Sequence, residues 1–202
     1  MIINIDYLLK KGNILINHIP FCVSLAMLKE LLNVKKQSKH NFDILLKWPN
    51  DFLIKINNEY RKIGGVMSEN YKGHFIIGFS CNLTTHPSQT QHFPAANLFT
   101  ESGIKLDCVV MAKNLINEIN NNIETTQKYG FSTIKEKWKK HAYMLGKKLI
   151  LKDNDKVLFK DITDDGHILA IKSNGKTKII ISSDEVIGGE NEIYIQGKKQ
   201  NH

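Results

Sequence analysis

The chain has 202 residues, of which 42% are hydrophobic and 24% charged, and 28 Lys and Arg against 20 Asp and Glu give a formal net charge of +8. This composition predicts a globular protein with room for one ordinary domain and a small second one. No apolar run approaches the roughly 20 residues of a membrane helix, and the first residues lack the pattern of a secretory signal peptide. The three cysteines are odd in number and far apart, which fits thiols in a reducing compartment. We therefore expect a cytoplasmic protein with no membrane partner.

The positive charge favours a negatively charged partner. Arginine is scarce, however, because Arg61 is the only one in the sequence. Recognition of nucleic acids usually depends on arginine interleaved with exposed aromatic residues, so we expect no DNA partner. A nucleotide or an acidic protein surface remains as the predicted class of partner.

The first half of the chain predicts a sheet and a covering helix. Ile14-Leu15-Ile16 has the pattern of a strand that leads past Pro20 into a helix over residues 23–32. Four more runs have strand patterns, and residues 57–60 suggest a hairpin turn. These runs cover residues 44–48, 52–56, 63–68 and 74–83. Because their connections are short, a mostly antiparallel or mixed sheet is expected.

The second half predicts two helices and then a small β module. Residues 84–103 have the composition of a long loop, residues 108–130 that of a helix ending near Gly130, and Ile134 to Leu145 that of a helix closed by Gly146. Four short strand-like runs follow, at residues 148–151, 156–160, 168–172 and 178–181. They suggest an SH3-like barrel. The expected organisation is a domain over residues 1–145, a barrel over residues 146–190 and a frayed tail over residues 191–202.

The most unusual segment is Lys47-Trp48-Pro49-Asn50-Asp51. Pro49 ends a strand, so Asn50 and Asp51 are expected in a turn with free side chains. A turn that offers a cation, an amide and a carboxylate can bind phosphates and hold a hydrated Mg²⁺ through oxygen ligands. The alternative is an Asx-type turn beside a core tryptophan.

Two glycine-containing strands follow this turn. In Arg61-Lys62-Ile63-Gly64-Gly65-Val66, adjacent glycines interrupt an apolar strand, which indicates a bulge or a close approach of the backbone to a ligand. Lys62 could reach a carboxylate or a phosphate there, or it could be a solvated lysine beside a hairpin bulge. In the run from Ile77 to Asn82, Gly78 interrupts another buried strand and Asn82 closes it.

Together and in this order, these three segments resemble the biotin protein ligases. The pattern of that family runs K-W-P-N-D, then a hairpin, then R/K-K-x-G/A-G-I/L with a glutamate shortly after, then I-G-x-G-x-N. Here the second segment is followed by Glu69, and the third contains Ile77-Gly78 and Asn82. The resemblance covers roughly Gly12 to Gly188. It implies an α+β fold in which a mixed sheet packs against helices, as in class II aminoacyl-tRNA synthetases and biotin ligases, followed by the SH3-like barrel.

The resemblance also implies a two-step ligase reaction. ATP and biotin form biotinyl-5′-AMP, and a lysine of a biotin carboxyl carrier domain then attacks the mixed anhydride. Lys62 matches the catalytic lysine, which contacts the biotin carboxylate and the adenylate phosphate. The other matched residues are Gly64 and Gly65 along the bound biotin, Gly78 and Asn82 on the pocket floor, and Lys47, Trp48, Asn50 and Asp51 on the ATP and metal side. Biotin, ATP and Mg²⁺ are the implied small molecules, with no metal site on the protein beyond a contact of Asp51 with Mg-ATP.

The sequence departs from the family at the biotin-binding loop, a G-R-G-R-x-G-R segment. Lys11-Gly12-Asn13-Ile14-Leu15-Ile16-Asn17 matches the strand that follows this loop, and Arg61 is the only arginine. Such a loop orders over the adenylate and shields it from water. We therefore expect weak biotin affinity and poor or no adenylation by this polypeptide alone. Ser80 replaces the second glycine of G-x-G and is expected to crowd the pocket.

Several alternatives stay open. A non-catalytic module that binds a partner chain or a nucleotide is the main one, and a relative of the lipoate ligases is a weaker one. Cys81, His86 and His92 have a spacing that could suit a metal, but no fourth ligand is apparent. Lysines at positions 135, 137, 139 and 140 form either a solvated helix face or a docking site for an acidic carrier domain. The oligomeric state, including a homodimer, is not determined by the sequence.

Overall fold

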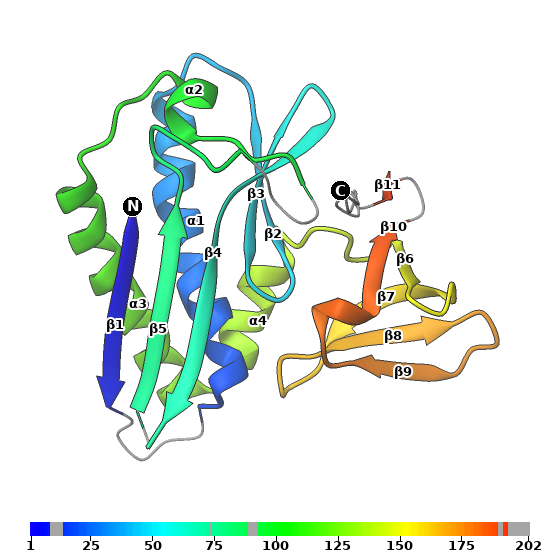
Figure 1. The fold of residues 1–202 in the computed structure, drawn as a ribbon. Helices are drawn as coiled ribbons and strands as arrows, with labels where there is room; N and C mark the ends of the chain where they lie inside the picture. Colours follow the sequence, from blue (N-terminus) through cyan, green and yellow to red (C-terminus); the bar gives the residue numbers. More distant parts are fainter. Residues whose placement is uncertain (9–13, 73, 89–92, 190–191, 194–202) are drawn as a thin grey trace, which may run out of the picture.

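The computed structural model describes the chain except residues 9–13, 73, 89–92, 190–191 and 194–202. The predicted tail, His92 and Lys11-Gly12-Asn13 therefore lie wholly or partly outside the described residues. Two sheets follow one another along the chain, and helices cover one face of the first sheet (Figure 1). No described helix is both long and apolar enough to cross a bilayer.

The first sheet has five strands in the order β1-β5-β4-β3-β2. Their bounds are β1 Ile2–Leu8, β2 Asp43–Lys47, β3 Asp51–Ile56, β4 Glu59–Tyr71 and β5 His74–Cys81. All pairings between these strands are antiparallel, which confirms the first of the two alternatives drawn from the short connections, whereas the mixed sheet implied by the family resemblance was wrong. The physical reason is the short connections between β2, β3, β4 and β5, since tight turns join antiparallel neighbours whereas parallel strands need long crossovers.

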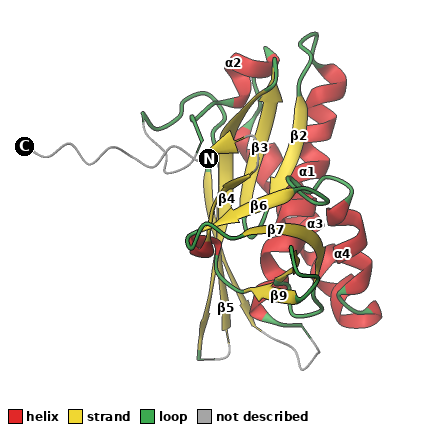
Figure 2. Ribbon diagram, turned by 90° about the vertical axis from the view of Figure 1, so that its right-hand side faces the viewer, coloured by secondary structure: helices red, strands yellow, loops and turns green. Residues whose placement is uncertain are grey.

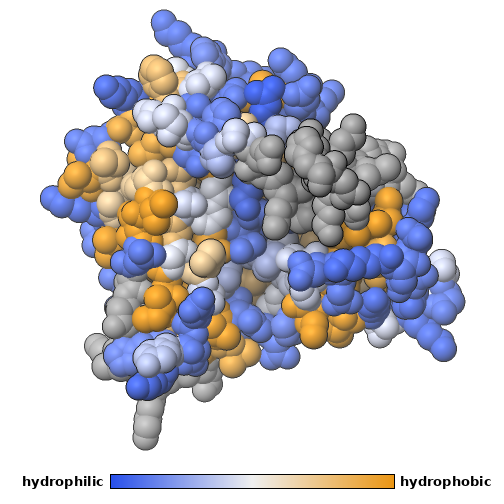
Figure 3. Space-filling model, viewed as in Figure 1, coloured by the Kyte–Doolittle hydropathy of each residue, from blue (hydrophilic) through white to orange (hydrophobic). Residues whose placement is uncertain are grey.

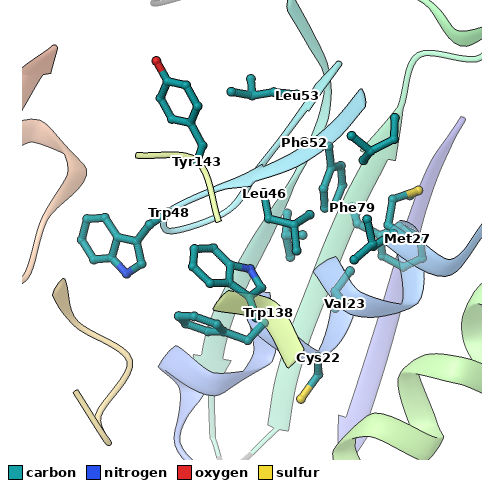
Figure 4. Packing of buried hydrophobic residues seen from close by; sticks show 14 of the residues in the cluster. Cys22, Val23, Met27, Leu46, Trp48, Phe52, Leu53, Phe79, Trp138 and Tyr143 are labelled. Atoms are coloured by element: carbon teal, nitrogen blue, oxygen red, sulfur yellow. The ribbon is translucent and has the colours of Figure 1, made fainter. Parts of the chain in front are cut away.

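Helices pack on one face of this sheet and leave its other face open (Figures 1 and 2). The helices are α1 Ile19–Gln37, α2 Leu98–Ser102, α3 Cys108–Tyr129 and α4 Ser132–Lys139. Phe52 and Phe79 of the sheet pack with Met27 of α1 in the core between these layers (Figure 4). On the open face, hydrophobic side chains remain exposed over β1, β5 and β4, among them Ile2, Met67 and Ile76 (Figure 3).

Two predicted elements of this part differ from the structure. The strand expected at Ile14–Ile16 is instead an irregular segment followed by a 3₁₀ helix, η1 Ile16–His18, which runs directly into α1. The helix expected to reach Leu145 ends at Lys139, and Gly146 is not its cap. The chain beyond α4 pairs instead with β2, because the Leu46 N–H donates to the His141 carbonyl and the Tyr143 N–H donates to the Leu46 carbonyl. The predicted end of α3 at Gly130 is confirmed.

The second sheet has six antiparallel strands in the order β11-β10-β6-β7-β8-β9. Their bounds are β6 Lys148–Leu151, β7 Lys156–Ile162, β8 Ile168–Lys172, β9 Thr177–Ile180, β10 Val186–Gly189 and β11 Glu192–Ile193. A 3₁₀ helix, η2 Ser183–Glu185, connects β9 to β10. The turns before β8 and β9 each contain a glycine with positive φ, Gly166 at 83° and Gly175 at 79°, a backbone conformation that glycine adopts readily.

One turn of the second sheet fixes it against the first layer. The Trp48 indole N–H donates to the Gly166 carbonyl over 2.8 Å, and Nε2 of the buried His18 lies 2.8 Å from the Asp164 carbonyl oxygen. The Lys135 ammonium lies 2.7 Å from the Asp164 carboxylate. The turn between β7 and β8 is thus held at three points, and the second sheet lies beside β2, β3 and α4 (Figure 1).

Candidate functional site

A cavity of about 600 Å³ opens where the two sheets approach one another. Its floor is formed by β3, β4 and β5 of the first sheet, and β1, the loop after β5 and η2 contribute to its sides. Eight of the nine predicted site residues line it: Lys47, Asn50, Asp51, Lys62, Gly64, Gly65, Gly78 and Asn82. The structure therefore brings together residues that come from three separate sequence segments.

The charged centre of this cavity consists of two lysines that converge on one aspartate. Lys62 Nζ lies 2.5 Å from Asp51 Oδ1, and Lys47 Nζ lies 3.6 Å from Asp51 Oδ2. The side chains of Lys47 and Asp51 are 10% and 9% exposed, whereas that of Lys62 is 33% exposed. Burial lowers the pKa of Lys47, Asp51 opposes that shift, and the charge of Lys62 adds to it. With Asp51 ionised and both lysines protonated, the cluster has a net charge of +1, which suits an anionic ligand.

A β-bulge sets the position of Lys62. Leu53 of β3 pairs with Lys62 and Phe52 pairs with Gly64, so Ile63 is the extra residue on β4. On its other side, the Lys62 backbone makes two hydrogen bonds with the loop after β5. The Lys62 N–H donates to the Pro94 carbonyl, and the Lys62 carbonyl accepts from the Ala96 N–H. A bulge of this kind redirects side chains locally. Of the two explanations predicted for the paired glycines, a bulge or a close approach of the backbone to a ligand, the structure shows the bulge.

The glycines of the floor have close neighbours within the protein, most severely at Gly64. A Cβ on Gly64 would collide with the Ser80 carbonyl oxygen, and a Cβ on Gly65 would lie 3.2 Å from Asp51 Oδ1. A Cβ on Gly78 would lie 3.0 Å from Asn4 Oδ1, the end of a side chain that also lines the cavity. Close packing of the backbone thus explains these glycines, and it also leaves a floor with few side chains. Ser80 of β5, two residues after Gly78, also lines the cavity.

Both predicted asparagines take part in local hydrogen bonds. The Asn50 amide donates to the Val66 carbonyl over 2.6 Å, which fixes the turn between β2 and β3 against β4. The Asn82 amide donates to the Ala96 carbonyl over 3.0 Å, which fastens the loop after β5. Each amide retains an oxygen that can accept a further hydrogen bond.

Three residues of the motifs lie away from the cavity. Trp48 does not line it, and its buried indole supports the second sheet through Gly166. The Arg61 guanidinium contacts the carboxylates of Glu59 at 2.9 Å and Glu101 at 3.1 Å. Glu69 lines a neighbouring cavity of about 410 Å³ together with Trp48. Contacts within the fold therefore explain Trp48 and Arg61.

Some lining residues were missed by the sequence analysis. Asn4 and Ile2 come from β1, an unpredicted strand, although alternating apolar residues at its start were a signal for it. Ser183 and Asp184 come from η2 in the second sheet. No local motif marks them, because only the packing of the two sheets brings η2 to the cavity.

The described members of the two other groups of residues singled out in the sequence lie outside the cavity. Cys81 is buried in β5, where burial raises the pKa of its thiol to about 12, and His92 lies outside the described residues. Among the described residues, no group of three or more His, Cys, Asp or Glu could hold a metal ion. In the lysine patch of α4, Lys135 pairs with Asp164 and Lys139 with Asp161, both in the second sheet. These two lysines therefore join the layers.

Comparisons with known proteins give a family match and a common fold. Residues 7–85 match the model of the biotin/lipoate A/B protein ligase family. Biotin protein ligase from Aquifex aeolicus superposes with a TM-score of 0.71 and 21% identity, covering 90% of this chain and 80% of that one. The same ligase in complex with biotin and ATP gives 0.67 and 22%, covering 92% and 77%. Biotin protein ligase from Leishmania major in complex with biotinyl-5-AMP gives 0.54 and 19%, covering 90% and 78%.

The resemblance to the biotin protein ligases is therefore confirmed. Residues 7–85, which contain β2 to β5 and most of the cavity floor, carry the sequence pattern of the biotin and lipoate ligases. Most of the described chain shares the α/β fold of the biotin ligases.

Proposed function

We propose that this chain is a biotin–protein ligase that forms biotinyl-5′-AMP from biotin and ATP and transfers the biotinyl group to a lysine of a biotin carboxyl carrier domain. One observation carries the proposal. Two lysine ammoniums meet a single carboxylate in a cavity of about 600 Å³ whose floor is built of glycines. Such a cavity offers positive charge for phosphates and an open surface for the bicyclic ring system of biotin.

The structural neighbours support this choice of ligands. The ligase from A. aeolicus was solved with biotin and ATP, and that from L. major with biotinyl-5-AMP. The family model covers the residues that supply Lys47, Asp51 and Lys62. By analogy with these proteins, the same cavity of this chain would take biotin and ATP side by side.

In the first step, a carboxylate oxygen of biotin attacks the α-phosphorus of ATP, and the bond to the β-phosphate oxygen breaks as pyrophosphate leaves. Negative charge gathers on the α-phosphate oxygens in the transition state, where fixed cations stabilise it. We assign Lys62 to the biotin carboxylate and the α-phosphate, because its side chain is the more exposed of the two lysines. Lys47 is more buried and would add positive charge without direct contact with the substrate, while Asp51 holds both ammonium groups in place.

The floor of the cavity is assigned to biotin. Gly64, Gly65 and Gly78 would let the ring system lie against the backbone, and Asn82 would offer its free amide oxygen at the end of β5. Asn50 would contribute to the ATP side through its own carboxamide oxygen. Ser80 places a hydroxymethyl group among these residues and would narrow the pocket.

Mg²⁺ would enter this site bound to ATP. It is commonly held by one or two carboxylates together with substrate phosphates, and Asp51 is the cavity carboxylate nearest to the two lysines. Asp51 already contacts Lys47 and Lys62. The metal would therefore contact Asp51 only if the phosphates replaced Asp51 as the ion-pair partner of these lysines. The ion would neutralise phosphate charge when it is bound.

We further propose that residues 146–190 form an SH3-like barrel appended to a catalytic domain over residues 1–145. The antiparallel sheet of short strands with a 3₁₀ helix before β10 supports this interpretation. We place the protein in the cytoplasm, since three free cysteines, two of them buried, suit a reducing compartment.

Incubation of the chain with ATP, Mg²⁺, biotin and a purified carrier domain tests the proposal. We expect slow transfer of biotin to the carrier lysine, because the sequence has no arginine-rich loop to shield the adenylate from water. The rate should depend on ATP and fall by about two orders of magnitude or more in Lys62→Ala, as for other groups that stabilise transition-state charge. Lys72→Ala, which removes an exposed lysine at the far end of β4, is the matched control and should retain activity. Binding of biotin or ATP without transfer would support the non-catalytic alternative instead.

A further inference from the structure

The cavity has a wall that belongs to the second sheet. Ser183 and Asp184 of η2 line it, although the charged centre lies entirely in the first sheet. Asp51 and Asp184 are the two acids among the described lining residues. Asp51 is occupied by two lysines, whereas Asp184 is exposed and forms no ion pair with any described residue.

Hydrogen bonds at the start of η2 fix the position of Asp184. The Asp184 N–H donates to Ser182 Oγ over 3.2 Å, and the Glu185 carboxylate accepts from the Ile181 N–H at 3.1 Å. Lys178 Nζ lies 3.4 Å from the Glu185 carboxylate, which leaves the neighbouring Asp184 free. Because the turn before β8 is fastened to the first layer, this wall keeps its place relative to Lys62.

The charges of the cavity are therefore separated. Lys47, Lys62 and Asp51 give the first-sheet side a net positive charge, and Asp184 gives the second-sheet side a negative one. The second step of the proposed reaction has the same polarity, because an anionic acyl-adenylate meets the positively charged ammonium of a lysine. An unpaired carboxylate at the rim of a cavity attracts and orients such a cation.

We propose that Asp184 is a positioning residue that receives the ammonium group of the carrier lysine at the mouth of the cavity. This inference rests on the proposed function and assigns a role within its second step. Asp184 accepts a hydrogen bond from the ammonium and thereby holds the carrier lysine at the mouth of the cavity before the lysine reacts. The carboxylate stays ionised and takes no part in bond making.

The chemistry of this step balances without another reactant. The lysine loses one proton to solvent, and its neutral nitrogen attacks the acyl carbon of biotinyl-5′-AMP. The C–O bond to the phosphate breaks, and AMP leaves with the electron pair of that bond. The nitrogen loses its second proton as the amide forms, and this proton passes to the leaving phosphate or to solvent.

The test separates the two steps on the full chain. Transfer is measured from supplied biotinyl-5′-AMP to a purified carrier domain, after subtraction of the reaction without enzyme. Biotin-dependent ATP–pyrophosphate exchange is measured in parallel. The variants are Asp184→Asn, Asp184→Glu and Asp165→Asn, the last of which removes an exposed acid that does not line the cavity.

For Asp184→Asn we expect an about fivefold rise in the KM for the carrier at low salt with little change in kcat, the size typical of one exposed ion pair. The difference from the parent should shrink as salt is raised, because screening weakens exposed charges. Asp184→Glu should recover most of the loss, and Asp165→Asn should behave as the parent.

Other results would overturn the inference. An equal loss in exchange and transfer would assign Asp184 to the nucleotide, and unchanged transfer would leave it no role in carrier binding. Absence of both exchange and transfer in the parent chain would instead contradict the proposed function, so the two failures can be told apart.

Discussion

Replacing Asp51 by Asn should destabilise the protein strongly, because it removes the negative charge that holds two lysines together. The Asp51 carboxylate is 9% exposed, with Lys62 Nζ at 2.5 Å and Lys47 Nζ at 3.6 Å. Removing one partner of a buried ion pair costs about 3–5 kcal/mol. Since the Lys62 side chain is 33% exposed, solvent screening reduces this cost, and we expect about 2–3 kcal/mol.

Thermal unfolding measures this cost. In a chain of this size, 1 kcal/mol corresponds to about 2–4 °C in the melting temperature, so Asp51→Asn should lower it by about 4–12 °C. Asp43→Asn is the matched control. The Asp43 carboxylate lies 2.6 Å from Lys35 Nζ, but it is 65% exposed, so its loss should cost less than about 1 kcal/mol.

The pH dependence of the same variant gives a second readout. Burial already lowers the pKa of Lys47, and loss of Asp51 should lower it further. The unfolded chain then binds more protons than the folded chain at pH values between the lowered pKa and the unfolded one, so stability rises with pH in that window. The cost of Asp51→Asn should therefore shrink on the alkaline side of neutrality. A cost equal to that of Asp43→Asn at every pH would refute the reasoning.

Three further predictions concern stability. Trp48→Phe should lower it by about 1–3 kcal/mol in thermal unfolding, because the Gly166 carbonyl loses its donor. Gly64→Ala should cost about 1–3 kcal/mol in urea unfolding, since the new methyl group meets the Ser80 carbonyl oxygen. Burial lowers the pKa of His18, which means that the folded protein favours the neutral imidazole. The stability that this residue contributes is therefore complete above the unfolded pKa of about 6.5 and is lost as the pH falls through the pKa of the folded state. His18→Gln should therefore lose less stability than the parent between pH 7.5 and pH 5.

Each of these predictions has a control or a contrary result. Trp138 Nε1 is buried without a partner in the described structure, so Trp138→Phe loses volume but no hydrogen bond. Gly78→Ala meets only the movable end of the Asn4 side chain and should be milder than Gly64→Ala. Equal costs at Gly64 and Gly78 would contradict the packing argument, and equal pH profiles for His18→Gln and the parent would exclude His18 as the titrating group.

The centre of the candidate site could be predicted because its residues lie close together in sequence and carry strong local signals. Asn57 and Asn58 adopt positive φ values of 49° and 67°, as a two-residue hairpin requires, and this turn pairs β3 with β4. The pairing sets Asp51 directly opposite Gly65. The local turn pattern therefore determined the register as far as Leu53 and Lys62, and the bulge at Ile63 shifted it by one residue for Asp51.

Other features depended on contacts that no local pattern contains. The apolar run at Ile14–Ile16 suits a strand or the start of a buried helix equally well. In the structure it leads into α1 through the 3₁₀ helix η1. The helical spacing that reaches Leu145 is overridden where the backbone of residues 141–143 pairs with Leu46. Trp48 belongs to the most specific motif, yet its indole N–H binds the Gly166 carbonyl of the second sheet and does not line the cavity. In these places tertiary contacts outweighed local propensity.

Binding of biotinol-5′-AMP, a non-hydrolysable form of the intermediate, tests the central claim most directly, because it requires the cavity but no turnover. Isothermal calorimetry on the full chain should show one site per chain. Lys62→Met should weaken the affinity by about tenfold or more, as expected for loss of a charge-assisted contact to phosphate. An absence of binding to the parent chain, or equal affinity in Lys62→Met, would contradict the assignment of this cavity to the acyl-adenylate.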